Sequence, residues 1–270
     1  MALLHVNFFS NVLGMCMNMD VILPQKTEGQ IGMEGNAPES YTYPTLYLLH
    51  GMSDDHTIWQ RRTSIERYAN DAGIAVVMPT THLGWYTDMK HGLKYFTFIA
   101  KELPQICREF FPRMSPKRED TFVAGLSMGG YGALKCGLAC PETFSKVGAL
   151  SSGIMFDPED TGSKRRHSEL FYNVFGEFED GIGSENDLFH LAKVRVESDG
   201  PKPEIFQWCG TDDSLYESNI HFRDYMAEIG YPVTYSEGPG GHSWDKWDEQ
   251  IQNVLKWMLS GAPDGDCAGN

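Results

Sequence analysis

The sequence predicts an α/β fold in which helices cover both faces of a mostly parallel central sheet that begins with an antiparallel hairpin. Short runs of β-branched and aliphatic residues alternate with longer amphipathic stretches along the 270 residues, the pattern of strands alternating with helices. Several short runs are almost continuously apolar, as expected of strands buried on both faces of a parallel sheet. The first two runs are close together in the chain, and they therefore predict the hairpin.

Eight runs are predicted to be strands. In chain order they are Leu4–Phe9, Met17–Leu23, Thr45–Leu49, Ile74–Met78, Thr121–Ala124, Val147–Leu150, Ile205–Trp208 and, more weakly, Val233–Ser236. The segment Pro24–Ser40, between the second strand and the third, is rich in glycine, proline and glutamate. It shows no periodicity and is interpreted as a loop.

Two of the longer stretches carry apolar residues at the three- and four-residue steps of a helix. They are Leu93–Phe111 and Trp244–Leu259. Pro104 lies inside the first stretch, so we expect a kink or two consecutive helices there. A further helix is predicted over Tyr131–Ala139, where Pro141 closes it.

The length predicts a single α/β domain over residues 1–260. The segment from Phe156 to about Val194 fits no simple strand–helix unit, because a charged stretch, Asp157–Arg166, is followed by scattered aromatic residues. Such a long connection favours a lid-like insertion over the site, around residues 156–194. The alternative is a surface insertion without a role at the site. Residues 261–270 are small and polar and predict a flexible tail.

The composition disfavours several classes of partner. The formal net charge of −15 argues against binding to nucleic acid or to an anionic membrane surface. No apolar run approaches the roughly 20 residues that span a bilayer, and no secretory signal is recognised, so we expect a cytoplasmic protein with reduced thiols. The six cysteines show no metal-ligand spacing. A homo-oligomer is left open.

The pentapeptide Gly125-Leu126-Ser127-Met128-Gly129 is the first candidate for a catalytic motif. A G-x-S-x-G match alone is weak, but here a predicted strand precedes Ser127 and a predicted helix follows it, which is the context that the motif requires. A sharp turn would hold the serine in a strained backbone conformation. Only small residues two positions to either side avoid a clash there, which explains Gly125 and Gly129. Ser127 is therefore the predicted nucleophile.

A serine hydroxyl needs a base to accept its proton. Among the nine histidines, His242 lies in the flexible loop Gly238–Trp244, after the last strand and before the last helix. In a parallel α/β fold that loop reaches the carboxyl edge of the sheet, beside the serine. His50 and His221 lie at a strand end and on a helix-like stretch and fit the role less well. His242 is the predicted base.

The imidazole needs a carboxylate that fixes its tautomer. After the strand Ile205–Trp208 come Asp212 and Asp213, and a Gly-x-x-Asp turn that starts at Gly210 selects Asp213. Asp212 would then be a turn or helix-capping residue. The order Ser127, Asp213, His242 is the chain order of the triad in α/β-hydrolases, so the predicted fold is the α/β-hydrolase fold.

A tetrahedral intermediate also needs backbone donors for its oxyanion. The expected donors are the N–H groups of Met128, directly after the nucleophile, and of Met52, in the turn after the third strand. Trp85 and Tyr86 follow the fourth strand on the same edge of the sheet. They are candidates for lining an acyl or aryl pocket, and packing within the loop is the alternative.

Taken together, the motifs of the chain resemble one family. In order they are Leu48-Leu49-His50-Gly51-Met52, Trp59, the serine motif extended to Ala133, Cys209-Gly210-Thr211-Asp212-Asp213 and Gly240-Gly241-His242-Ser243-Trp244. From about residue 5 to 259 the chain resembles the tributyrin esterase/feruloyl esterase family, in the esterase D–like group that includes S-formylglutathione hydrolases. The resemblance implies a serine carboxylesterase without a cofactor, acting through Ser127, Asp213 and His242.

The resemblance implies small-molecule substrates, namely short-chain (acetyl-like) or hydroxycinnamoyl (feruloyl) esters. Two alternatives remain at this point. A thioesterase like S-formylglutathione hydrolase, or an acyltransferase, would share the triad and differ in the acyl donor or acceptor. A catalytically inactive binding protein could use the same fold, although the complete triad and the glycine pattern argue against it.

Overall fold

The computed structural model describes residues 1–29, 31–32, 36–38, 40–159 and 168–260. Eight strands in these residues form one sheet in the order β1-β2-β4-β3-β5-β6-β7-β8. They are β1 Ala2–Ser10, β2 Met15–Leu23, β3 Thr45–Leu49, β4 Ala75–Pro79, β5 Thr121–Leu126, β6 Lys146–Leu150, β7 Glu204–Gly210 and β8 Val233–Gly238. All eight predicted strands are present, with small shifts at their ends.

The hairpin and the parallel body of the sheet are also as predicted. Strand β2 pairs antiparallel with both β1 and β4, and every pairing from β4 through β3 and β5 to β8 is parallel. The loops that follow the parallel strands therefore meet at one edge of the sheet, which we call the carboxyl edge.

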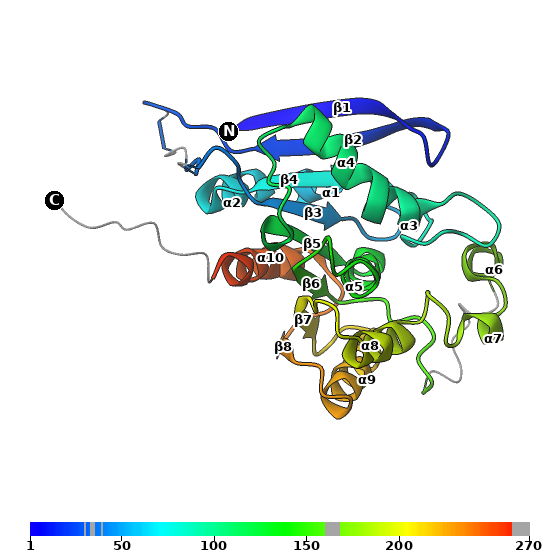
Figure 1. The fold of residues 1–270 in the computed structure, drawn as a ribbon. Coiled ribbons are helices and arrows are strands. Elements are labelled where there is room, and N and C mark those ends of the chain that lie inside the picture. Colours follow the sequence, from blue (N-terminus) through cyan, green and yellow to red (C-terminus); the bar gives the residue numbers. More distant parts are fainter. Residues whose placement is uncertain (30, 33–35, 39, 160–167, 261–270) are drawn as a thin grey trace.

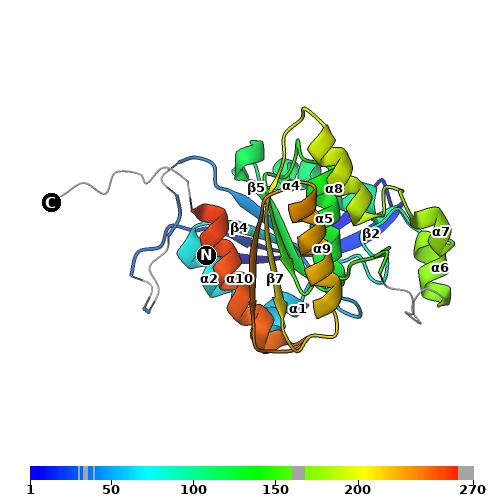
Figure 2. The same cartoon turned by 90° about the horizontal axis from the view of Figure 1, so that it is seen from below.

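Helices cover both faces of the sheet (Figures 1 and 2). The described helices are α1 Ile58–Arg62, α2 Ile65–Ala72, α3 Tyr95–Thr97, η1 Phe98–Glu102, α4 Leu103–Phe110, η2 Arg118–Asp120, α5 Met128–Ala139, α6 Glu169–Phe175, α7 Phe178–Gly181, α8 Leu188–Glu197, α9 Tyr216–Glu228 and α10 Trp244–Leu259. Helices α4, α5, α8 and α9 share one apolar core, and α1, α2 and α10 share the other. Successive residues of β3 alternate between the two cores, because side chains of a strand point to opposite faces.

The predicted interruption at Pro104 is present and has a specific form. The stretch is divided into α3, one π-helical turn (η1) and α4, and Pro104 lies in the first turn of α4, where a missing N–H is tolerated. Glu102, at the end of η1, accepts hydrogen bonds from Ser10 Oγ and from the backbone N–H groups of Asn11 and Val12. The π turn thus fixes the tip of the β1–β2 hairpin.

The segment predicted as a lid-like insertion contains α6, α7 and the start of α8. Figure 1 shows α6 and α7 on the side toward which the β3 arrow points, next to the carboxyl edge. Their aromatic side chains form a cluster of four phenylalanines in ring contact, Phe156, Phe171, Phe175 and Phe178. Most of the charged stretch Asp157–Arg166 and the predicted tail 261–270 lie outside the described residues. The single domain and the lid stay predictions.

Candidate active site

Ser127 occupies a strained turn between β5 and α5. Its backbone φ of 55° and ψ of −117° lie outside the regions that L-residues ordinarily adopt. A Cβ on Gly125 would collide with the carbonyl oxygen of Gly129, and a Cβ on Gly129 would lie 2.5 Å from the carbonyl oxygen of Leu49. The strained serine and the two required glycines agree with the turn predicted from the motif.

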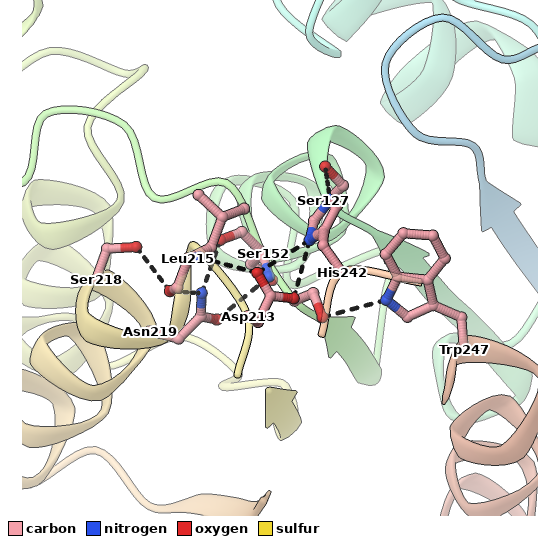
Figure 3. Close-up of polar contacts among 9 residues, drawn as sticks. Ser127, Ser152, Asp213, Leu215, Ser218, Asn219, His242 and Trp247 are labelled. Carbon is pink, nitrogen blue, oxygen red and sulfur yellow. Dashed lines mark hydrogen bonds and ion pairs between the residues drawn. The ribbon is translucent and has the colours of Figure 1, made fainter. Parts of the chain in front are cut away.

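His242 lies in the loop between β8 and α10 and connects two side chains from other loops (Figure 3). Its Nε2 atom lies 3.0 Å from Ser127 Oγ, and its Nδ1 atom lies 2.9 Å from Asp213 Oδ2. A carboxylate can only accept, so Nδ1 carries the proton and Nε2 of the neutral ring is free to accept from the serine hydroxyl. The structure therefore brings together the three residues predicted for the triad.

The two aspartates after β7 have different partners. Asp213 is buried and contacts His242, while Asp212 accepts a hydrogen bond from the backbone N–H of Gly240 at 3.1 Å. Burial alone would raise the pKa of Asp213, but hydrogen bonds from His242, from the N–H of Leu215 and from the Ser151 hydroxyl outweigh it. The pKa of Asp213 is thus lower than its ordinary value, and the carboxylate stays ionised beside the imidazole.

The turn after β3, where Met52 was predicted as an oxyanion donor, lies against Ser127. A Cβ on Gly51 would be 3.8 Å from the Cβ of Ser127. Met128 is the first residue of α5, and the N–H of a first helical residue has no acceptor within its helix. The two predicted donors thus lie in segments next to Ser127, and their role stays a prediction.

A buried histidine, His50, shapes the same turn. It donates from Nδ1 to the carbonyl oxygen of Gly51 at 2.7 Å and accepts the backbone N–H of Thr81 on Nε2 at 3.0 Å. Burial lowers the pKa of His50 to about 4, so the ring is neutral and can accept. The sequence made His50 a weaker candidate for the base than His242 and gave no signal for this structural role.

Trp85 and Tyr86, the two candidates for the substrate pocket, are placed differently. Trp85 lines an apolar pocket of about 320 Å³. Tyr86 is fully buried, and its hydroxyl donates to the carbonyl oxygen of His50 at 2.8 Å. Tyr86 therefore holds the turn that carries His50 and does not line the pocket. This corresponds to the alternative that it packs within the loop.

The apolar pocket joins three segments that are far apart in the chain. Its lining residues are Met52, Trp85, Met155, Ser168, Leu170, Phe171 and Phe175. Four of the seven, Ser168, Leu170, Phe171 and Phe175, lie in the segment predicted as a lid-like insertion, and Met155 directly precedes it. The sequence showed aromatic residues there but could not show which of them face the site.

Lys135, on α5, lies in the helix that follows Ser127 and was not singled out from the sequence. Its side chain is buried, and Nζ donates to Thr87 Oγ1 at 3.0 Å and to Asn186 Oδ1 at 2.5 Å. Burial lowers the pKa of Lys135 to about 8. One side chain thus links α5, the loop after β4 that carries Trp85, and the segment predicted as a lid-like insertion.

Backbone strain is concentrated around this site. Among the described residues, seven non-glycine residues have a positive φ: Ser53, His82, Trp85, Tyr86, Ser127, Ser151 and Phe156. All of them follow the carboxyl ends of β3, β4, β5 or β6.

Over the described residues, no group of three or more His, Cys, Asp or Glu side chains could hold a metal ion. None of the described helices has the length and apolar character that a membrane span needs.

Comparison with known proteins agrees with this geometry. The family model described as "Putative esterase" matches residues 10–258. The chain belongs to this esterase family. It is 33% identical to an acetyl esterase of Caldicellulosiruptor saccharolyticus, over 96% of this chain and 98% of the relative. The resemblance inferred from the motifs is confirmed, and the esterase is a serine carboxylesterase.

Solved structures confirm the α/β-hydrolase fold. The S-formylglutathione hydrolase of Staphylococcus aureus superposes on the esterase with a TM-score of 0.81 at 33% identity, covering 96% of this chain and 99% of that one. A ferulic acid esterase superposes with a TM-score of 0.77 at 25% identity, covering 96% and 97%. The chain therefore shares its fold with an S-formylglutathione hydrolase and a ferulic acid esterase, the two kinds of enzyme to which its motifs are similar.

Proposed function

We propose that the esterase hydrolyses carboxylic esters through an acyl-enzyme intermediate on Ser127. The observation that carries this proposal is the position of His242, whose two ring nitrogens lie 3.0 Å from Ser127 Oγ and 2.9 Å from Asp213 Oδ2. His242 accepts the hydroxyl proton as Ser127 attacks the ester carbonyl, and returns it to the leaving alcohol. Water then attacks the acyl carbonyl while His242 accepts its proton, and His242 returns this proton to Ser127 Oγ as the acyl–oxygen bond breaks and the carboxylic acid leaves.

The N–H groups of Met52 and Met128 hold the oxyanion of both tetrahedral intermediates in this mechanism. Preorganised backbone donors of this kind are worth about 10²–10³ in rate each. The helix dipole of α5 adds to them, because Ser127 lies at the N-terminus of that helix.

We further propose that the apolar pocket receives the acyl part of the substrate. Met52 lines this pocket and neighbours Ser127 through the turn at Gly51, so an acyl group held in the pocket has its carbonyl carbon at the nucleophile. The walls are aromatic and aliphatic apart from Ser168. Such a lining favours a short or medium acyl chain or an aromatic acyl group such as feruloyl over a charged one.

Thioester hydrolysis is a second candidate, favoured by the similarity to the S-formylglutathione hydrolase. In this proposal the pocket holds the acyl group, which esters and thioesters share. The triad chemistry is also the same for an alcohol or a thiol leaving group. A panel of p-nitrophenyl acetate and butyrate, methyl ferulate and S-formylglutathione, compared by kcat/KM, distinguishes the candidates. The highest value for the oxygen esters supports carboxylic ester hydrolysis as the main activity, and the highest value for the thioester contradicts it.

Replacement of the nucleophile tests the mechanism. Ser127→Ala is expected to abolish p-nitrophenyl acetate hydrolysis and labelling by a fluorophosphonate, with an unchanged circular dichroism spectrum. Ser152→Ala is a matched control, because it removes another buried serine hydroxyl close to the site. More than a few per cent residual activity in folded Ser127→Ala excludes Ser127 as the nucleophile.

A further inference from the structure

Ser151, directly after β6, is strained and buried although it takes no part in the proposed triad. Its side chain is fully buried and its backbone φ is 45°, in the left-handed region that non-glycine residues rarely adopt. Its backbone N–H donates to the carbonyl oxygen of Trp208 at 2.8 Å. A glycine would occupy this conformation at lower cost, so the side chain of Ser151 itself needs an explanation.

The Ser151 hydroxyl is oriented by Trp247, on α10. The indole Nε1–H of Trp247 lies 3.1 Å from Ser151 Oγ, and this N–H can only donate. Ser151 Oγ must therefore accept there, which leaves its own proton to donate elsewhere. The Ser151 hydroxyl lowers the pKa of both the Asp213 carboxyl and the Cys209 thiol, which makes these two groups the candidate acceptors of its proton. Of these, the ionised carboxylate is the stronger acceptor.

The Asp213 carboxylate is consequently held from several sides. Its Oδ1 atom accepts from the N–H of Leu215 at 2.8 Å, its Oδ2 atom contacts His242, and the Ser151 hydroxyl lowers the pKa of the carboxyl, as a donor to it does. These contacts fix the plane of the carboxylate. The side chain of His242 is 32% exposed, so the imidazole depends on Asp213 for its orientation.

Trp247 also touches the imidazole directly. The ring centroids of Trp247 and His242 are 4.8 Å apart at an interplanar angle of 88°, an edge-to-face contact. Figure 3 shows Trp247 entering the site from α10, on the side opposite Asn219. Trp247 packs in turn against Trp244, and Trp244 against Trp59. The indole that contacts His242 and Ser151 is therefore itself fixed.

We infer that Trp247 and Ser151 are positioning residues, which act together through one hydrogen bond to hold Asp213 and His242 in the geometry needed by Ser127. The inference rests on the proposed triad. The indole N–H sets the direction of the serine hydroxyl, the hydroxyl holds the carboxylate, and the carboxylate holds the imidazole. Since neither residue touches the substrate, their loss changes kcat and leaves KM unchanged.

Two substitutions remove this connection at different points. Trp247→Phe keeps an aromatic ring against His242 but removes the N–H. Ser151→Ala removes the hydroxyl. With p-nitrophenyl acetate, each is expected to lower kcat about tenfold, the effect of one hydrogen bond to a charged group, with KM unchanged. The double variant is expected to lose no more than Ser151→Ala alone, because both act through the same bond.

The controls separate positioning from general packing. Trp257→Phe changes another tryptophan of α10, and Ser152→Ala removes a buried hydroxyl without a hydrogen-bond partner among the described residues. Both are expected to keep the wild-type kcat. Ser151→Gly removes the hydroxyl and relieves the strained φ, so it is expected to match Ser151→Ala in kcat and to exceed it in melting temperature.

The outcomes are distinct from those that test the triad. Unchanged kcat in Trp247→Phe, or losses that multiply in the double variant, overturns the inference even when Ser127→Ala is inactive. Recovery of wild-type kcat in Ser151→Gly overturns it too, because the hydroxyl would then be dispensable. Activity in folded Ser127→Ala overturns the proposed function instead. If Ser151→Ala does not fold, Trp247→Phe alone still decides.

Discussion

Asp212 and Asp213 are neighbours in the chain, but their carboxylates hold different atoms of the same loop. Asp213 lies 2.9 Å from Nδ1 of His242, and Asp212 accepts the backbone N–H of Gly240 at 3.1 Å. One carboxylate therefore orients the imidazole, and the other braces the loop that carries it.

This difference predicts unequal effects of two conservative substitutions. Asp213→Asn is expected to lower kcat by about 10³–10⁴-fold, because an amide neither stabilises the imidazolium nor holds the reactive tautomer. Asp212→Asn keeps an oxygen acceptor for Gly240 and is expected to lower kcat by less than about tenfold. Steady-state hydrolysis of p-nitrophenyl acetate measures both, and equal losses would contradict the assignment of the acid.

The close contact between α5 and β3 predicts a strong effect at Gly129. A methyl group there would lie 2.5 Å from the carbonyl oxygen of Leu49, and backbone cannot move away as a flexible side chain can. Gly129→Ala is expected to destabilise the fold by roughly 1–3 kcal/mol or more. Thermal unfolding measures the change. Gly238→Ala, at a position with no atom within 4 Å of an added Cβ, is the control and is expected to have little effect.

His50 predicts a pH dependence of stability. Burial lowers the pKa of His50 from 6.5 to about 4 in the folded protein, so between these values the unfolded chain binds a proton here that the folded protein does not. The free energy of unfolding therefore falls as the pH decreases from about 6.5 to 4, by up to about 3 kcal/mol from this residue.

The matching variant is His50→Gln, which cannot titrate in this range. Urea unfolding midpoints at pH 4.5 and 7.5 are expected to differ less in His50→Gln than in the wild type. A wild type and a variant with the same pH dependence would show that the protonation of His50 contributes nothing.

The apolar pocket predicts a change of acyl preference on filling. Leu170, on α6, lines the pocket, and Leu170→Trp reduces its volume. The ratio of kcat/KM for p-nitrophenyl butyrate to that for the acetate is expected to fall about tenfold, since one or two methylenes lose their space. Tyr172→Trp, at a half-exposed position on the same helix, should leave the ratio unchanged. A ratio unaffected by Leu170→Trp would place the acyl group elsewhere.

The sequence predicted the parts of this molecule that depend on local pattern. Each strand is a short apolar run that can be recognised from its own residues. Ser127, Asp213 and His242 each follow a strand, so their meeting at one edge follows from the parallel topology. The choice of Asp213 over Asp212 depended on the length of one turn, which is also a local property.

The pocket could not be predicted in the same way. It needs Met52, Trp85 and Phe171 to meet from three segments, and their directions depend on how α6 packs rather than on periodicity. The burial of Lys135 had no sequence signal, because a lysine on a helix is ordinarily exposed. Tyr86 shows the same limit, since a residue next to a pocket-lining tryptophan points into the core instead.

The strained residues that follow β3, β4, β5 and β6 have a consequence for engineering this esterase. Each holds a backbone conformation that costs free energy, and the rest of the fold supplies that energy. Substitutions that relax these positions should raise the melting temperature and slow turnover together. Thermostable variants that keep their speed are therefore better sought far from the carboxyl edge, for example on the outer surfaces of α2 and α9.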